Sequence, residues 1–284
     1  MTILQALLLG TLQGLTEFLP VSSTAHLYIA QAMLKIRNDE IALSFDVVLH
    51  LGTALAVLVA FFRPIAGLFA ELIRWATGRP ARDPESRALL LPLAAGTVPG
   101  VAAGLLLLKH VEAIRTLALI GGSMLVACAY FFAAEHIADR SGAAPRVLAR
   151  VNLADALWIG LAQAAAGLMA GFSRSGLTIS TGLVRGIRRS DSARFSFLLA
   201  LPLITGAGAK ALLDLRHVSG PPISGAVLAV GFLSSAAVGY LAIRALLRFL
   251  ATHTLRPFAI YLGLLGAGLL AASILLGLPL IGAR

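Results

Sequence analysis

Long stretches without a charged residue constrain this chain more than any other feature. A helix needs about 20 mostly apolar residues to cross the hydrocarbon core of a bilayer. Four stretches reach that length without a single Asp, Glu, Lys or Arg: residues 88–108, 116–134, 217–243 and 257–283. Only 13% of the 284 residues are charged and 58% are hydrophobic, whereas a soluble domain carries about 25% charged residues. The chain is therefore expected to be an integral membrane protein.

Two further stretches reach spanning length with a charge inside them. Residues 44–73 continue an apolar pattern past Arg63, and residues 195–213 include Lys210. Together the six stretches predict six transmembrane helices in an all-α polytopic membrane protein. No separate soluble domain is visible, so residues 1–284 are expected to form a single membrane domain.

Two other apolar segments are interrupted by polar residues near their middle. Segment 2–35 is broken between Glu17 and His26, where a proline and three hydroxyl residues intervene. Segment 153–185 is broken within the motif Gly-Phe-Ser-Arg-Ser-Gly at 171–176. Non-helical backbone at membrane depth is tolerated only where protein or a water-filled cavity surrounds it. We therefore expect two re-entrant helical hairpins in addition to the six spans.

The two interrupted segments also resemble each other in sequence. Gly10-x-x-Gln13 recurs as Gly160-x-x-Gln163, and Ser22 and Ser173 lie 151 positions apart. A steady offset of about half the chain predicts two internal repeats, 1–140 and 150–284.

Arginine-rich loops predict how these repeats are oriented. Three or four arginines fall in each of the segments 74–87, 140–150, 185–194 and 244–256, and loops of this kind face the cytoplasm. All four arginine-rich segments fall on the cytoplasmic side if the first hairpin enters the membrane from the outside and the second enters from the cytoplasm. The second repeat is then inverted relative to the first. Inverted repeats place a site near the bilayer midplane, where the broken helices meet. The net charge of +10 is therefore explained by basic loops that orient the protein in the membrane and contact anionic lipids, and it does not indicate nucleic-acid binding.

Arg174 follows an uncharged run, 156–172, and at this depth needs an anionic partner. One interpretation is an ion pair with Glu17 that only joins the hairpins. The other is a phosphate clamp, because guanidinium matches phosphate in bidentate geometry. Backbone N–H groups beside two glycines at a helix N-terminus and two serine hydroxyls would assist it. The residues expected to contribute are Gly171, Ser173, Ser175 and Gly176.

The first hairpin carries the groups expected to do chemistry. His26 lies three residues after Ser23, which puts both on one helical face, as for a nucleophile and its base. Glu17 is expected to orient the imidazole, to bind a divalent cation or to act as acid and base. Gln13 shares the face of Glu17, four residues away, and is expected to hydrogen-bond either Glu17 or an oxygen of the substrate.

Three more polar residues are assigned lesser roles. Ser22 and Thr24 are expected either to bind substrate or only to cap the following helix. His50 is interpreted as structural.

Segments 13–26 and 171–179 resemble the two signatures of the bacterial undecaprenyl-diphosphate phosphatases of the bacitracin-resistance type. They read Gln-Gly-Leu-Thr-Glu-Phe-Leu-Pro-Val-Ser-Ser-Thr-Ala-His and Gly-Phe-Ser-Arg-Ser-Gly-Leu-Thr-Ile. Segments 45–52 and 193–202 are also similar to family segments, so the likeness covers nearly the whole chain. One departure is Ala170, where the family usually has proline.

This resemblance implies a hydrolase that removes the terminal phosphate of undecaprenyl diphosphate. The product, undecaprenyl phosphate, is recycled as the carrier for peptidoglycan synthesis. The resemblance also implies a multi-pass protein of the bacterial cytoplasmic (inner) membrane, with its site open to the outer face and a divalent cation, Mg²⁺ or Ca²⁺, as cofactor. It suggests a homodimer.

Carried over onto matching positions, the family's catalytic set is Glu17, Ser23, His26 and Arg174, with Glu17 as the metal ligand. The nucleophile stays open among Ser23, His26 and water. A competing hypothesis is an inverted-repeat secondary transporter, or a flippase for a lipid phosphate, because broken helices in inverted repeats are typical of transporters.

Overall fold

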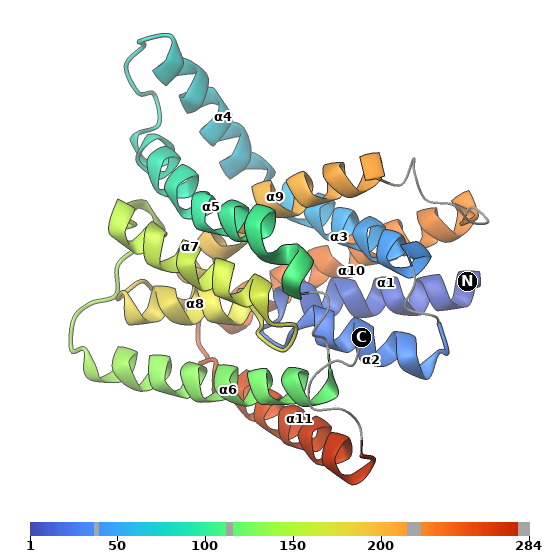
Figure 1. Ribbon diagram of the computed structural model, residues 1–284. Helices are drawn as coiled ribbons and strands as arrows, with labels where there is room; N and C mark the ends of the chain where they lie inside the picture. The colour runs from blue at the N-terminus through green and yellow to red at the C-terminus, as the bar shows by residue number, and fades with distance from the viewer. Residues whose placement is uncertain (37–39, 112–115, 215–222, 278–284) are drawn as a thin grey trace.

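The computed structural model describes residues 1–36, 40–111, 116–214 and 223–277, and within these ranges the chain is helical with no β-strand (Figure 1). The first half contains α1 (Ile3–Phe18), α2 (Ser23–Met33), α3 (Glu40–Ala60), α4 (Phe62–Ala76), α5 (Pro84–Val111) and α6 (Leu117–Arg140). The second half contains α7 (Leu153–Leu168), α8 (Arg174–Val184), α9 (Arg189–Asp214), α10 (Gly225–Phe249) and α11 (Arg256–Leu275). The all-α class is therefore confirmed.

Five of these helices are long and apolar enough to cross a membrane. They lie at Pro84–Leu106, Leu117–Arg140, Arg189–Lys210, Gly225–Phe249 and Arg256–Leu275. Helices α3 and α4 together make a sixth candidate, which is bent by 81°. The parts of the predicted spans that cover 217–222 and 278–283 lie outside the described residues.

The bend between α3 and α4 differs from the single span predicted at 44–73. Figure 1 shows α4 leading away from the other helices. The buried Glu71 carboxylate accepts hydrogen bonds from the backbone N–H groups of Arg82 and Asp83, both at 2.9 Å. Large apolar side chains of the same helix, such as Phe69 and Trp75, are exposed. Helix α4 is thus amphipathic, and its polar side is bonded to the loop that follows it.

Both interrupted segments fold as two short helices joined by a turn. Helices α1 and α7 have 16 residues each, and α2 and α8 have 11 each. At 1.5 Å per residue a 16-residue helix is about 24 Å long, less than the ~30 Å hydrocarbon core. Helices α1 and α7 each begin with a capping box, at Thr2 and at Asn152. The interruptions therefore fall where the sequence predicts them.

Small residues let the longer arm of each hairpin pack closely on a candidate membrane span. A side chain at Gly10 of α1 would come within 2.6 Å of the Gly231 carbonyl oxygen in α10. A side chain at Gly160 of α7 would come within 3.0 Å of the Gly96 Cα in α5. The two contacts hold α1 and α7 against different helices, with the turns of both hairpins directed into one region.

Candidate active site

The turns of the two hairpins are bonded directly to each other. We call residues 19–22 the first tip and residues 169–173 the second tip. The Ser22 hydroxyl donates to the carbonyl of Ala170 at 2.6 Å, and the Ser175 hydroxyl, just after the second tip, donates to the carbonyl of Leu19 at 3.1 Å. A serine from each hairpin is therefore bonded to the backbone of the other hairpin's tip.

The backbone of each tip explains how its serines are aimed. Ser22 has a left-handed conformation, with φ of 70° and ψ of 88°, and its side chain makes no capping bond to α2. Such a conformation is uncommon for a residue other than glycine. Ser173 instead caps α8, because its Oγ accepts a hydrogen bond from the N–H of Gly176 at 3.2 Å. Of the two serines, Ser173 serves as a cap and Ser22 links the tips.

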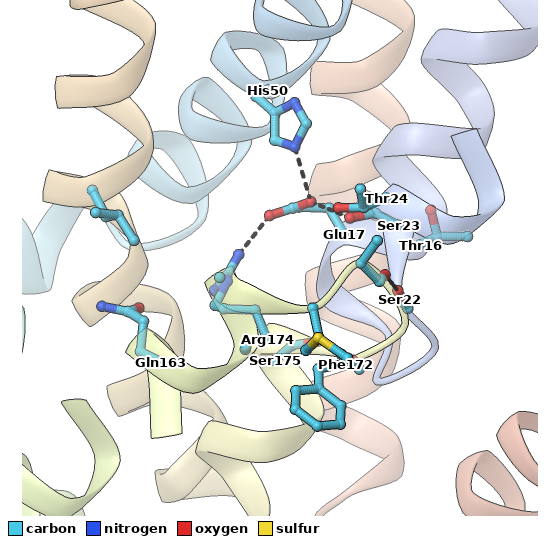
Figure 2. Close-up of a pocket in the computed structure, with 16 residues that line it drawn as sticks. Thr16, Glu17, Ser22, Ser23, Thr24, His50, Gln163, Phe172, Arg174 and Ser175 are labelled. Carbon is cyan, nitrogen blue, oxygen red and sulfur yellow. Dashed lines mark hydrogen bonds and ion pairs between the residues drawn. The ribbon is translucent and has the colours of Figure 1, made fainter. Parts of the chain in front are cut away.

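The Glu17 carboxylate is the centre of the polar contacts between the hairpins (Figure 2). Its Oε1 accepts a hydrogen bond from Arg174 Nη2 at 2.5 Å. Its Oε2 accepts from Gln13 Nε2 at 2.9 Å and from the Ser23 hydroxyl at 2.6 Å. His50 Nε2 lies 3.7 Å from the same oxygen. Glu17 is only 8% exposed, so this carboxylate is held almost entirely by protein donors.

Glu17, Ser23, Arg174 and His50 line a pocket of about 180 Å³, and Gln13 is not part of its wall. A cavity of this size can hold a small polar head group. Most of the residues singled out from the sequence line it: Glu17, Ser22, Ser23, Thr24, Ser173, Arg174 and Ser175. The pocket therefore brings residues of both hairpins together, as expected for two polar interruptions that face each other.

His26 is directed elsewhere. Its Nδ1 lies 2.8 Å from the Ser22 carbonyl oxygen and its Nε2 lies 2.6 Å from the Tyr261 hydroxyl. The two rings also stack, with centroids 5.7 Å apart. Because Ser23 donates to Glu17 instead, the expected pairing of Ser23 with His26 is not formed. Helical spacing placed both residues on one side of α2 without fixing which neighbour each would contact.

His50 lies at the site, although the sequence analysis did not include it there. It lies in α3 and lines the pocket. Its Nδ1 is 2.7 Å from the carbonyl oxygen of Asp46, one turn earlier, which directs Nε2 towards Glu17. The structure thus places His50 at the pocket, and its interpretation as a structural residue stays a prediction. A histidine in an apolar helix is itself a signal for a functional site.

The two glycines of the second motif have a packing role that the sequence did not indicate, while the anion-binding role expected of Gly171 stays a prediction. A side chain at Gly171 would collide with Ser123 and Ile120 of α6, and one at Gly176 would collide with the Phe131 ring. The N–H of Gly176 is also engaged by Ser173. Both glycines are needed for close packing against α6, and the N–H of Gly176 is not free to bind an anion.

Gln163 was noted in the sequence only as a marker of the repeat. It is 1% exposed and lines the pocket. Its position in α7 matches that of Gln13 in α1, since each lies ten residues after the first residue of its helix. That correspondence was the available signal for a role in the site.

A divalent cation in this pocket would be bound by Glu17 together with oxygens of the substrate. No group of three or more His, Cys, Asp and Glu side chains comes together as a metal site within the part of the chain that the structure describes. Mg²⁺ is commonly held by one or two carboxylates together with substrate phosphates and waters. The single carboxylate of this pocket fits that pattern and does not fit a site built from protein ligands alone.

Comparison with known proteins agrees with the resemblance seen in the motifs. Residues 6–268 match the family described as bacitracin resistance protein BacA. An undecaprenyl-diphosphatase of Rubrobacter xylanophilus is 45% identical over 96% of this chain and 99% of its own length. The undecaprenyl-diphosphatase of Geobacter sulfurreducens is 41% identical over 95% of this chain and 98% of its own. One from Pelobacter propionicus is 39% identical over 98% and 99%. This chain is therefore a member of the bacitracin resistance protein BacA family.

Proposed function

We propose that this protein is a membrane-embedded undecaprenyl-diphosphate phosphatase. It removes the terminal phosphate of undecaprenyl diphosphate and yields undecaprenyl phosphate for reuse in peptidoglycan synthesis. The observation that carries the proposal is the pocket in which Arg174 of one hairpin meets Glu17 and Ser23 of the other. Relatives that match nearly the full chain are named for this activity.

Arg174 is the group suited to hold the diphosphate. Its side chain is 17% exposed, and a guanidinium can bond two phosphate oxygens at once. The Thr24 hydroxyl lines the same pocket and can add a donor once the head group is bound, whereas the hydroxyls of Ser22 and Ser175 already donate to backbone carbonyls of the tips. The pocket is small, so the tail would stay in the surrounding lipid.

Ser23 is the nucleophile that the geometry supports best. Its hydroxyl hydrogen is already directed at Glu17 Oε2, at 2.6 Å, so the carboxylate can take the proton as Oγ attacks the terminal phosphorus. Glu17 passes this proton to the lipid-borne phosphate as the P–O bond between the two phosphates breaks, so undecaprenyl phosphate leaves and the carboxylate is ionised again. Water attacks the phosphoserine, loses a proton to the carboxylate and releases inorganic phosphate, and the proton returns to Oγ.

Charge on the transferring phosphoryl group needs stabilisation throughout. Arg174 supplies a fixed cation at the pocket. A Mg²⁺ or Ca²⁺ ion, held by Glu17 and the substrate's own oxygens, would add a second positive charge. His26 enters the proposal as a positioning residue, because it contacts the Ser22 carbonyl next to the nucleophile.

We further propose that the two hairpins are re-entrant and belong to inverted repeats, with α3 and the five long helices as the six membrane spans. Equal lengths of α1 and α7, and of α2 and α8, support this arrangement. The pocket would open to the outer face of the cytoplasmic membrane. The homodimer stays a prediction.

Phosphate release from purified protein tests the function. The native protein is incubated with undecaprenyl diphosphate and Mg²⁺, and free phosphate is measured over time. Glu17→Ala and Arg174→Ala should lose turnover, while Arg188→Ala, an arginine whose side chain is 54% exposed and pairs with Asp191, should retain it. The proposal is refuted if folded native protein releases no phosphate, or if Arg174→Ala matches Arg188→Ala.

A further inference from the structure

Gln163 is a buried amide without a hydrogen-bond partner. Neither its Oε1 nor its Nε2 is bonded to any residue that the structure describes, and the residue is 1% exposed. Burying an unpaired amide costs free energy, so such a group calls for an explanation, for example a ligand that completes it. Gln163 lines the same pocket as Glu17 and Arg174, so a ligand in that pocket can reach the amide.

Gln13 of the first hairpin shows what the corresponding amide does when an acceptor is present. Its Nε2 donates to the carboxylate of Glu17, four residues later, at 2.9 Å. The residue four positions after Gln163 is Gly167, which also lines the pocket. A side chain built at Gly167 would meet no described atom within 4 Å. The second hairpin therefore keeps the amide and has open space where the first hairpin has a carboxylate.

Arg174 offers a second unused donor to that space. Its Nη2 is bonded to Glu17, but its Nη1 is buried and has no partner among the described residues. In the view of Figure 2, Gln163 lies on the side of Arg174 away from Ser23. A guanidinium bonded to the carboxylate through one nitrogen can therefore bind an anion through the other.

The wall around Gln163 is apolar. Leu203 lies beside it, because Leu203 Cδ2 and Gln163 Nε2 both come within 3.5 Å of the Cβ position at Gly100, and both Leu203 and Ala166 line the pocket. The hydroxyl of Ser23 and His50 instead lie beside Glu17. A lipid diphosphate has one end that is only phosphate and one end that continues into hydrocarbon. The apolar side of the pocket suits the second end.

From these contacts we propose that Gln163 and Nη1 of Arg174 form a binding site for the phosphate that remains attached to the lipid. This site rests on the proposed function and adds to it a distinction between the two phosphates. The terminal phosphate lies beside Ser23 and Glu17. The lipid-borne phosphate occupies the space over Gly167 and accepts from Gln163, as the Glu17 carboxylate accepts from Gln13.

The test separates lipid phosphate from free phosphate. KM and kcat for undecaprenyl diphosphate, and inhibition by undecaprenyl phosphate and by inorganic phosphate, are measured for native protein and three variants. Gln163→Met keeps the length of the side chain and removes the amide. Gly167→Glu places a carboxylate in the proposed phosphate position. Ser180→Ala is the matched control, because Ser180 is also fully buried with an unpaired hydroxyl but does not line the pocket.

Gln163→Met is expected to raise KM roughly tenfold or more, the factor for one hydrogen bond to a charged group. The fall in kcat should be smaller, because the lipid-borne phosphate is anionic before and after transfer and is bound throughout. Inhibition by undecaprenyl phosphate should weaken by a similar factor, and inhibition by inorganic phosphate should not change. Gly167→Glu should raise KM further, and Ser180→Ala should behave as native.

The proposal is overturned if KM and inhibition by undecaprenyl phosphate stay within twofold of the native values in Gln163→Met. If Gln163→Met does not fold, the same result in Gly167→Glu overturns it. Equal weakening of both inhibitors would also overturn it, since the amide would then not distinguish the two phosphates. Direct binding of undecaprenyl phosphate, measured by thermal shift, separates this site from the proposed function. If native protein released no phosphate but bound undecaprenyl phosphate in a Gln163-dependent way, the function would fail and the site would stand.

Discussion

The ion pair between Arg174 and Glu17 can be tested as a structural link and as catalytic machinery in one experiment. Two unit charges 2.5 Å apart attract by about 7 kcal/mol at an effective dielectric constant of about 20. Desolvation of both groups offsets much of that attraction. Removing one partner of a buried pair nevertheless costs about 3–5 kcal/mol, because the other charge is left uncompensated.

Arg174→Met should therefore destabilise the protein by about 3–5 kcal/mol, since it leaves a carboxylate that is only 8% exposed. The double variant Glu17→Gln/Arg174→Met removes both charges. It should recover a large part of that loss, since the amide at position 17 can still accept from Ser23. Both variants should lack phosphatase activity, because the cation that holds the diphosphate is absent from each.

The assay is a double-mutant cycle on the unfolding free energy of native, single and double variants in one detergent, with phosphate release measured on the same samples. Effects that add within about 0.5 kcal/mol would show that the two charges are not coupled, and the reasoning from burial would be wrong. Recovered stability together with recovered turnover would mean that the pair serves only to join the hairpins.

Three further predictions concern neighbours of this pair. Ser23→Ala should abolish the phosphoenzyme that native protein forms with ³²P-labelled substrate; a labelled His26 in acid-quenched native protein would contradict Ser23 as the nucleophile. His50→Gln should lower kcat by roughly 10- to 100-fold without unfolding the protein, because the side chain lies beside Glu17 and is 32% exposed; unchanged kcat would remove His50 from the site. Gly176→Ala should destabilise by about 1–3 kcal/mol through its clash with Phe131; Phe131→Leu should restore part of that loss in unfolding titrations, and failure to do so would argue against the packing role.

The class of the protein and the positions of its two helix interruptions could be predicted from the residues alone. Uncharged runs of spanning length are a local property, and the bilayer sets the length they need. Proline, serine and glycine at 19–23 and 171–176 end helices for reasons within the chain, and α1 and α7 end there. The family signatures are also contiguous in sequence, so they could be read without a structure.

Which polar groups contact one another could not be predicted from the residues and depends on how the helices pack. A three-residue spacing puts Ser23 and His26 on one helical face. The Ser23 hydroxyl nevertheless donates to a carboxylate of α1, and the His26 ring contacts the Tyr261 hydroxyl of α11. Likewise, His50 reaches Glu17 because α3 packs beside α1. Such partners come from helices distant in sequence. Their side-chain directions depend on how the helices pack, and no periodicity within one segment carries that information.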